Sequence, residues 1–399
     1  MQLGRKFGVF KLLRLLHRYV GLAIALFIIL AALTGSLLAF MPELEKLTAP
    51  RLYSSEATSP RLSFADYASA AENIDSRVLV RSVSFAEQGR VIVGVMAKNN
   101  PATGELFLLG FSQMLLDPTD GTLLGVRTHG SLSEGWHNIM PFIYQLHYSL
   151  ILGAPGWWLM GIVAVIWTID CFTGLLITLP LRAKRRTPRR SFMSRWAKAW
   201  KIKTGSSFAR FNFDLHRALS LWLWLVLLVF AWSSVYMNLW GSFYLHATRQ
   251  VMEFHPPWYH LADREPSDRQ PPISWQAAQT YADDAMQALA QREQIEIIQP
   301  NALAYVRSYG AYRYRAQSSR DLSAKHVRTE VYVDAVTGEP IFHYLPTGQY
   351  AGNTVSSWLH VLHRARIWGV WYQIFVSLLG VFLVVISVSG VLVWWKKRA

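Results

Sequence analysis

Four long stretches of the chain carry almost no charged side chains. Residues 19–42, 218–248 and 367–395 contain no Asp, Glu, Lys or Arg, and residues 145–181 contain only Asp170. Each stretch exceeds the ~20 residues that a helix needs to cross the hydrocarbon core of a membrane. The pattern therefore predicts an α-helical membrane protein with four transmembrane helices.

The two long segments between these stretches have patterns typical of small α+β domains. In each, a serine is placed to cap a helix: Ser63 before a helix to about residue 74, and Ser274 before a helix to about residue 289. Strand-like runs follow at residues 77–85, 90–96 and 106–116, and at residues 295–298, 303–309, 311–317 and 329–333. We expect a helix packed on a small antiparallel sheet, twice.

The positive charges predict the orientation. Residues 181–213 carry eleven Lys or Arg and no acid, the N-terminal lead carries Arg5, Lys6, Lys11 and Arg14, and the tail ends in Lys396, Lys397 and Arg398. By the positive-inside rule these segments face the cytoplasm and both long loops lie outside. Because the basic residues gather at membrane edges, where anionic lipid is the expected partner, the formal net charge of +15 does not indicate a nucleic-acid partner.

This topology divides the chain into seven parts. They are the cytoplasmic N-terminus with transmembrane helix 1 (1–42), outer domain 1 (43–142), transmembrane helix 2 (143–181), the basic cytoplasmic loop (182–215), transmembrane helix 3 (216–248), outer domain 2 (249–358), and transmembrane helix 4 with the cytoplasmic tail (359–399).

Four histidines occupy matched positions beside these stretches. His17 and His216 begin the first and third, and His147 and His363 precede the second and fourth, so that the two pairs have similar offsets along the chain. The pattern indicates a duplicated two-helix unit and sorts the histidines into an inner pair (His17 and His216) and an outer pair (His147 and His363). Ligand-capable groups at such places indicate a functional site.

Neutral imidazole is the usual axial ligand of low-spin haem, and two imidazoles from facing helices hold the iron within a bundle. Two such sites at opposite membrane faces would carry electrons across it. The competing interpretation is that each histidine only makes a packing hydrogen bond. The single cysteine, Cys171, rules out a disulfide, and the absence of a C-x-x-C-H motif rules out covalently attached haem.

Small and basic residues near the histidines fit a porphyrin. Gly21 lies one helical turn after His17, and Gly35 lies five turns after it, roughly 27 Å further along that helix face. His147 and His363 each precede a glycine by the same interval, and we expect these two, Gly174 and Gly390, near the inner pair. Directly after three of the histidines come Arg18, Arg217 and Arg364, which either pair with haem propionates or extend to water.

Other polar groups leave alternatives open. His137, His246 and His360 compete with His147 and His363 for the role of outer ligand. Asp170, the one acid within a span, serves either proton transfer or quinol chemistry, or makes a structural hydrogen bond.

With these residues laid out, the chain resembles the PepSY-associated transmembrane family, and within it the FoxB-type ferric-siderophore reductases and PiuB-like iron-regulated membrane proteins. The resemblance rests on Leu16-His17-Arg18-Tyr19-Val20-Gly21, Leu33-Thr34-Gly35, Leu146-His147, Gly153-Ala154-Pro155-Gly156, Thr173-Gly174, Leu215-His216-Arg217, Leu362-His363-Arg364 and the segment from Ser389 to Trp395. It covers essentially the whole chain. One departure is that Ser233-Ser234 stands where the first span has Thr34-Gly35.

The resemblance implies a multi-pass protein of the bacterial inner membrane, with PepSY-like periplasmic domains and cytoplasmic termini, that carries two haem b groups. His17 and His216 would hold the cytoplasmic-side haem, and His147 and His363 the periplasmic-side haem. The expected function is reduction of a ferric siderophore, with electrons from quinol or a partner reductase, since no dinucleotide-binding fingerprint is present. The alternatives are a non-catalytic assembly or regulatory protein whose outer domains bind a partner, and a transporter of metal or solute.

Overall fold

The computed structural model describes residues 2–53, 59–86, 90–180, 191–255, 261 and 269–396. Residues 181–190 at the start of the basic loop and residues 397–399 at the end of the chain lie outside this part, so some of the basic residues that predict the orientation are not described. The chain forms two compact units: a membrane unit of Met1–Ala39, Gln145–Ala247 and Leu362–Ala399, and a sheet unit of Phe40–Tyr144 and Thr248–Val361.

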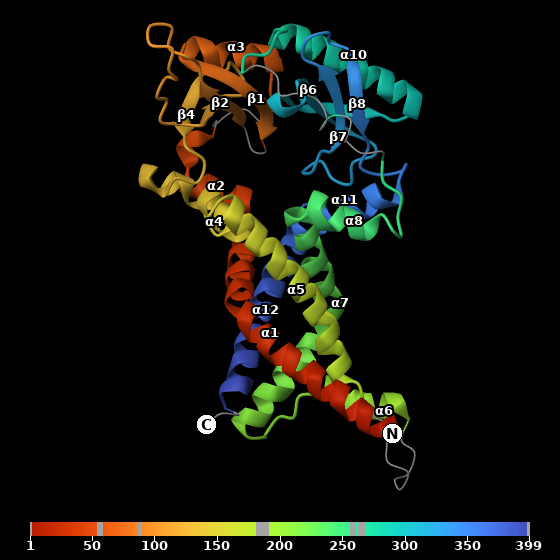
Figure 1. Ribbon diagram of the computed structural model, residues 1–399. Helices are drawn as coiled ribbons and strands as arrows, with labels where there is room; N and C mark the ends of the chain where they lie inside the picture. The colour runs from red at the N-terminus through yellow and green to blue at the C-terminus, as the bar shows by residue number, and fades with distance from the viewer. Residues whose placement is uncertain are drawn as a thin grey trace. The chain divides into compact units, whose positions relative to one another are not determined.

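Four long helices build the membrane unit: α1 (Gln2–Leu38), α5 (Ala154–Thr178), α7 (Phe208–Asn238) and α12 (Gly369–Trp395). All four are long and apolar enough to cross a membrane, as the hydropathy pattern predicts. Helices α1 and α7 each pack against both α5 and α12, so α1 and α7 lie diagonally opposite each other in the bundle (Figure 1).

Two of these helices begin later than the charge-free stretches predict. His147 lies on a separate helix, α4 (Ile139–Ser149), and His363 ends another, α11 (Ala351–His363). The chain adopts positive φ angles at Leu150, Ile151 and Gly153 between α4 and α5, and at Ala365 and Trp368 between α11 and α12. Such residues end a helix. Hydropathy scores how apolar each side chain is and not the conformation of the backbone, so it does not reveal these breaks.

The sheet unit contains one eight-stranded antiparallel sheet in the order β4-β3-β2-β1-β5-β6-β7-β8. Its strands are β1 (Val78–Ala86), β2 (Arg90–Ala97), β3 (Gln113–Leu116), β4 (Leu123–Arg127), β5 (Ile297–Val306), β6 (Ala311–Ser318), β7 (Thr329–Asp334) and β8 (Pro340–Tyr344). Helices α3 (Phe64–Ile74) and α10 (Trp275–Glu293) lie on the same face of the sheet and share one hydrophobic core with it (Figure 1).

The helices of this unit begin where the sequence predicts. The Ser63 side chain accepts a hydrogen bond from Asp66 N in a complete capping box, and the Ser274 side chain accepts one from Ala277 N. The two sets of strands, however, join in one sheet because β1 pairs with β5, with Val83 opposite Leu303. Separate small sheets were predicted because strand pairing between distant segments leaves no local signal.

The remaining elements are short. They are the α-helices α2 (Met41–Thr48), α6 (Phe192–Trp196) and α8 (Leu245–Thr248), the 3₁₀ turns η1 (Pro50–Leu52), η2 (Leu132–Glu134), η3 (Trp136–Asn138), η4 (Ala197–Trp200) and η6 (Arg307–Tyr309), and the π-helical turn η5 (Trp240–Tyr244).

Candidate functional site

The structure brings the four matched histidines together as two pairs within the membrane unit. His17 on α1 faces His216 on α7, with ring centres 6.2 Å apart. His147 on α4 faces His363 on α11, with ring centres 6.1 Å apart. Histidines from segments far apart in the sequence thus meet at nearly identical spacing.

Each of the four rings is held by a hydrogen bond at Nδ1 from a different helix. His17 Nδ1 lies 2.8 Å from Asp170 Oδ1, and His216 Nδ1 lies 2.9 Å from the carbonyl oxygen of Ile386. In the outer pair, His147 Nδ1 lies 2.9 Å from Thr34 Oγ1, and His363 Nδ1 lies 2.7 Å from Ser233 Oγ.

These partners determine which ring nitrogen carries the proton. A carboxylate and a carbonyl can only accept, so Nδ1 donates in His17 and His216. The Thr34 hydroxyl donates to the Leu30 carbonyl at 2.7 Å and the Ser233 hydroxyl to the Phe230 carbonyl at 2.9 Å, so both hydroxyls accept from the rings. In the part of the chain that the structure describes, no hydrogen bond reaches Nε2 of any of the four. Nε2 therefore keeps its lone pair for a metal ion.

The two pairs lie at opposite ends of the bundle. Thr34, which holds an outer histidine, follows His17 on the same helix, and Ser233 follows His216 by the same interval. At the helical rise per residue this interval is roughly 25 Å. Ser233 replaces Thr34 in the second half of the chain but keeps the hydroxyl that contacts the outer histidine. The equal interval from His17 to Thr34 and from His216 to Ser233 is the sequence signal that could have revealed these two hydroxyls.

Three glycines pack directly against the rings. A Cβ atom at Gly35 would lie 3.1 Å from His147 Cε1, at Gly174 3.2 Å from His17 Cε1, and at Gly390 2.9 Å from His216 Cε1. Any side chain there would press on a histidine. Gly35 thus lies beside the outer pair and Gly174 and Gly390 beside the inner pair, as expected, while the room that they would leave for a porphyrin stays a prediction.

A cavity of about 610 Å³ surrounds the inner pair. This volume lies within the ~300–1,000 Å³ typical of cofactor and ligand pockets. Both rings line it together with Gly21 and Asp170, and its walls are otherwise mostly apolar, with side chains such as Ile28.

The three arginines that follow the histidines differ in their surroundings. Arg217 is held by the Asp214 carboxylate at 2.7 Å and by the carbonyl oxygens of Lys198 and Ala199, and it lines the inner cavity. Arg18 lines the same cavity. Arg364 directly follows His363, beyond the end of α11.

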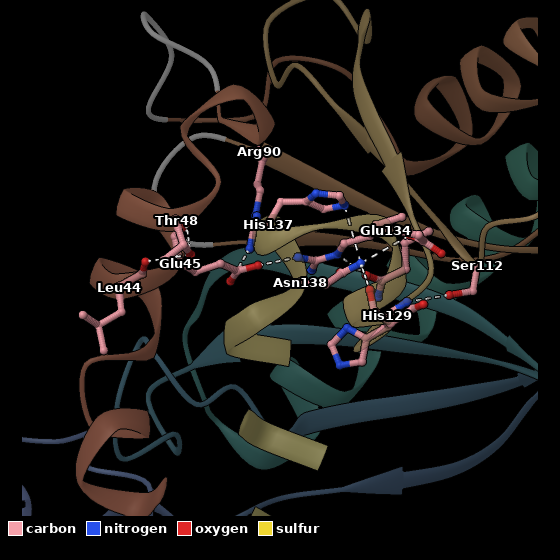
Figure 2. Close-up of polar contacts among 12 residues, drawn as sticks. Leu44, Glu45, Thr48, Arg90, Ser112, His129, Glu134, His137 and Asn138 are labelled. Carbon is pink, nitrogen blue, oxygen red and sulfur yellow. Dashed lines mark hydrogen bonds and ion pairs between the residues drawn. The ribbon is translucent and has the colours of Figure 1, made fainter. Parts of the chain in front are cut away.

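The competing histidines occupy other surroundings. His360 stacks on His326 with ring centres 3.9 Å apart, and both belong to the sheet unit. His137 lies in η3, with its Nε2 atom 3.5 Å from Asn138 Nδ2 (Figure 2). His246 lies on the short helix α8 at the end of the third apolar stretch. The ring that faces His147 is therefore that of His363, with ring centres 6.1 Å apart, and not that of His137, His246 or His360.

A second buried polar cluster lies within the sheet unit (Figure 2). Glu45 forms ion pairs with Arg90, at 2.8 Å, and with Arg127, and all three side chains are at most 6% exposed. Burial raises the pKa of Glu45, but the charges of the two arginines outweigh it and leave that pKa below its ordinary value. Arg90 also lies over the Tyr53 ring. This cluster joins α2 to strands β2 and β4, and the sequence offered no signal for it.

The spacing within each histidine pair matches two imidazoles bound to one metal ion. With metal–nitrogen bonds of ~2.0–2.1 Å and a ring centre about 1.1 Å from Nε2, two rings on opposite sides of a metal have centres about 6.3 Å apart. The separations of 6.2 and 6.1 Å are close to this value. Two neutral nitrogen donors beside a cavity, as at the inner pair, are residues that would fit a b-type haem.

The family of the chain is established by its sequence. The family model for the PepSY-associated TM region matches residues 14–397, so the chain belongs to this family of membrane proteins. A comparison with curated proteins gives no significant match.

Proposed function

We propose that this protein is a dihaem b electron-transfer protein of the bacterial inner membrane, a haem-dependent ferric-siderophore reductase that releases Fe(II) in the periplasm. The observation that carries the proposal is the presence of two histidine pairs at opposite ends of one bundle. In the two pairs the ring centres are 6.2 and 6.1 Å apart, and both Nδ1 atoms of each pair are hydrogen-bonded.

When bound, two haems would accept and pass on single electrons between the two membrane faces. The chain's own residues hold and orient them. His17 and His216 would hold the inner haem and His147 and His363 the outer one, each through Nε2. Arg18 lies where a haem propionate at the inner cavity would find a cation.

Apolar side chains lie between the two sites, and several of them also line the inner cavity. Leu219, Leu227, Leu379 and Ile386 form one apolar cluster of the bundle, and Ile24, Ile28 and Val163 form another. Trp167 and Leu383 contact both clusters. A charged species is costly in an apolar interior of this kind. Bound haems would therefore supply the route for electrons through it.

The duplicated spacing supports the same proposal. The interval from an inner histidine to the hydroxyl residue is the same in both halves of the chain, and so is the interval from an outer histidine to the glycine. Both equalities fit a two-helix unit written twice. The basic segments fit cytoplasmic termini, with the sheet unit in the periplasm. The two PepSY-like domains would then be the halves of one periplasmic sheet.

A ferric siderophore is proposed as the substrate because the chain resembles ferric-siderophore reductases, and the chemistry of iron explains how reduction would release the ion. Hard oxygen chelators bind Fe(III) strongly, and the lower charge of Fe(II) weakens those bonds, so that reduction releases the ion. Electrons would reach the inner pair from quinol or from a partner reductase.

The proposal is tested by two measurements on the purified protein. Pyridine haemochrome analysis should give two haems per chain. Chemically reduced protein mixed with a ferric hydroxamate should then be reoxidised while a ferrous-specific chromophore traps Fe(II). Protein purified from cells supplied with haem that contains none would refute the proposal and favour a non-catalytic assembly or regulatory role. Reduced protein that ferric chelates fail to reoxidise would refute the reductase activity alone.

A further inference from the structure

One of the four hydrogen bonds to the histidines differs from the others in charge. His17 donates to a carboxylate, Asp170, whereas His216 donates to a backbone carbonyl and the outer histidines donate to hydroxyls. The Asp170 side chain is 12% exposed, and its Oδ1 atom also accepts a hydrogen bond from the Thr173 hydroxyl at 2.8 Å. The inner pair therefore carries a formal negative charge that the outer pair lacks.

The bundle does not need a carboxylate to hold a histidine at this place. Asp170 follows His147 by the same interval as Ile386 follows His363, so the two residues occupy equivalent positions in the repeat. Both positions contact an inner histidine, yet at Ile386 the ring is held by the backbone carbonyl at 2.9 Å, with the Ser389 hydroxyl 3.3 Å from the same nitrogen and no carboxylate. The carboxylate thus adds something beyond orientation of the ring.

A carboxylate that accepts the Nδ1 proton of a metal-bound imidazole increases the basicity of the ligand. A more electron-rich ligand stabilises Fe(III) relative to Fe(II), and the negative charge itself acts in the same direction. Cations at the cavity oppose this effect. Asp214 forms ion pairs with both Arg210 and Arg217, so it offsets the charge of Arg217 only in part, and no hydrogen bond links Arg14 or Arg18 to either ring in the described part of the chain. The direct 2.8 Å contact of Asp170 should therefore dominate.

We propose that Asp170 is a positioning residue that lowers the reduction potential of the inner haem below that of the outer haem. This inference rests on the proposed function. One electron accepted from quinol or a partner reductase at the inner site would then move to the outer site with a favourable free energy, without any bond being formed or broken. The hydrogen bond from His17 to Asp170 would thus favour electron transfer from the inner haem to the outer haem, toward the ferric chelate.

The test is a redox titration of the haem-loaded protein, followed by its visible absorbance. Asp170→Asn keeps the shape of the side chain and an oxygen acceptor but removes the charge. We expect both haems to remain and the lower of the two midpoint potentials to rise. The expected shift is about a tenfold change in the reduction equilibrium, which corresponds to 59 mV for a one-electron couple. The higher potential should not move.

A second variant should act in the opposite direction. Thr173→Val removes a hydrogen bond that draws electron density from Asp170, so the lower potential should fall further. It also keeps the proposal testable if Asp170→Asn loses haem. The assignment of the lower potential to the inner site is checked in a His363→Ala background, which should retain only the inner haem.

The outcomes separate the two proposals. A wild-type chain without haem refutes the proposed function. A loaded chain in which Asp170→Asn shifts neither potential, or shifts both equally, refutes the role of Asp170 and leaves the proposed function intact. Failure of Thr173→Val to lower the inner potential also counts against that role.

Discussion

The inner and outer histidine pairs share a geometry and differ in how their rings are held. Their ring centres are 6.2 and 6.1 Å apart, but the inner rings donate to a carboxylate and a carbonyl, whereas both outer rings donate to hydroxyls. The bundle therefore specifies the position of each ring, and the hydrogen-bond acceptor specifies its electronic character. Any difference in behaviour between the two sites should trace to these acceptors.

The largest effect should come from removing one ring of a pair. His17→Ala leaves one imidazole at the inner site, and we expect the haem content to fall from two to one per chain while the outer haem keeps its absorbance. His363→Ala should remove the outer haem instead. His343→Ala, a histidine of the sheet unit, serves as the matched control and should leave two haems. Either pair variant with full haem content would contradict the assignment for that pair.

Glu45→Gln tests whether loss of any buried carboxylate imitates loss of Asp170. The substitution leaves Arg90 and Arg127 without their counter-charge, which should cost about 3–5 kcal/mol of stability. Both midpoint potentials should stay unchanged, because Glu45 belongs to the sheet unit. Thermal unfolding and redox titration measure the two quantities, and a shifted inner potential would weaken the specific role of Asp170.

The pH dependence of the Glu45 effect has a definite sign. Its pKa is below the ordinary value of 4.5 in the folded protein, so the unfolded chain binds the proton more readily. The stabilisation is therefore fully present above the unfolded pKa and is lost as the pH falls through the folded pKa. The stability difference between the wild type and Glu45→Gln should be constant near neutral pH and shrink in acid. A difference that grows in acid would contradict the ion-pair assignment.

Gly390→Ala tests the packing of the inner site. The new Cβ would lie 2.9 Å from His216 Cε1, too close for contact without movement. We expect a loss of about 1–3 kcal/mol, the usual cost of overpacking, together with weaker retention of the inner haem. Gly241→Ala, where nothing lies within 4 Å of the new atom, is the control. Equal effects of the two variants on haem retention would show that the glycine is not there to accommodate His216.

The smallest effect should come from one hydroxyl of the outer pair. Thr34→Val removes the acceptor of the His147 proton while it keeps the volume, and loss of such a partner typically costs about 10–100-fold in affinity for the bound group. We expect about tenfold weaker retention of the outer haem, with the inner haem unaffected. In the control Thr168→Val, the lost hydroxyl reaches only the Ala164 carbonyl of its own helix. Loss of haem from the inner site in Thr34→Val would contradict the pairing.

The sequence predicted the membrane helices and the histidine pairs because both leave local or periodic signals. Charge-free runs mark α1, α5, α7 and α12, and matched spacings mark the four histidines. The capping serines Ser63 and Ser274 likewise act on their own helices. These features need only a single segment, or two copies of one pattern, to be recognised.

What the sequence did not reveal depends on contacts between distant segments. The bond from Asp170 to His17 joins residues 153 positions apart, and a buried acid alone does not indicate its partner. The breaks before α5 and α12 depend on left-handed residues such as Ile151 and Trp368, which hydropathy treats as ordinary apolar positions. Strands β4 and β8 are short and were absent from the predicted set.

The pairing of β1 with β5 has a consequence for any attempt to divide the chain. A fragment that ends before α10 would keep β1 through β4 but would leave one side of β1 without a neighbour, and the complementary fragment would expose β5 in the same way. Bare strand edges recruit other chains, so severed halves should aggregate or re-associate with each other. The two halves of the chain are thus joined within the sheet unit by the main-chain hydrogen bonds between β1 and β5.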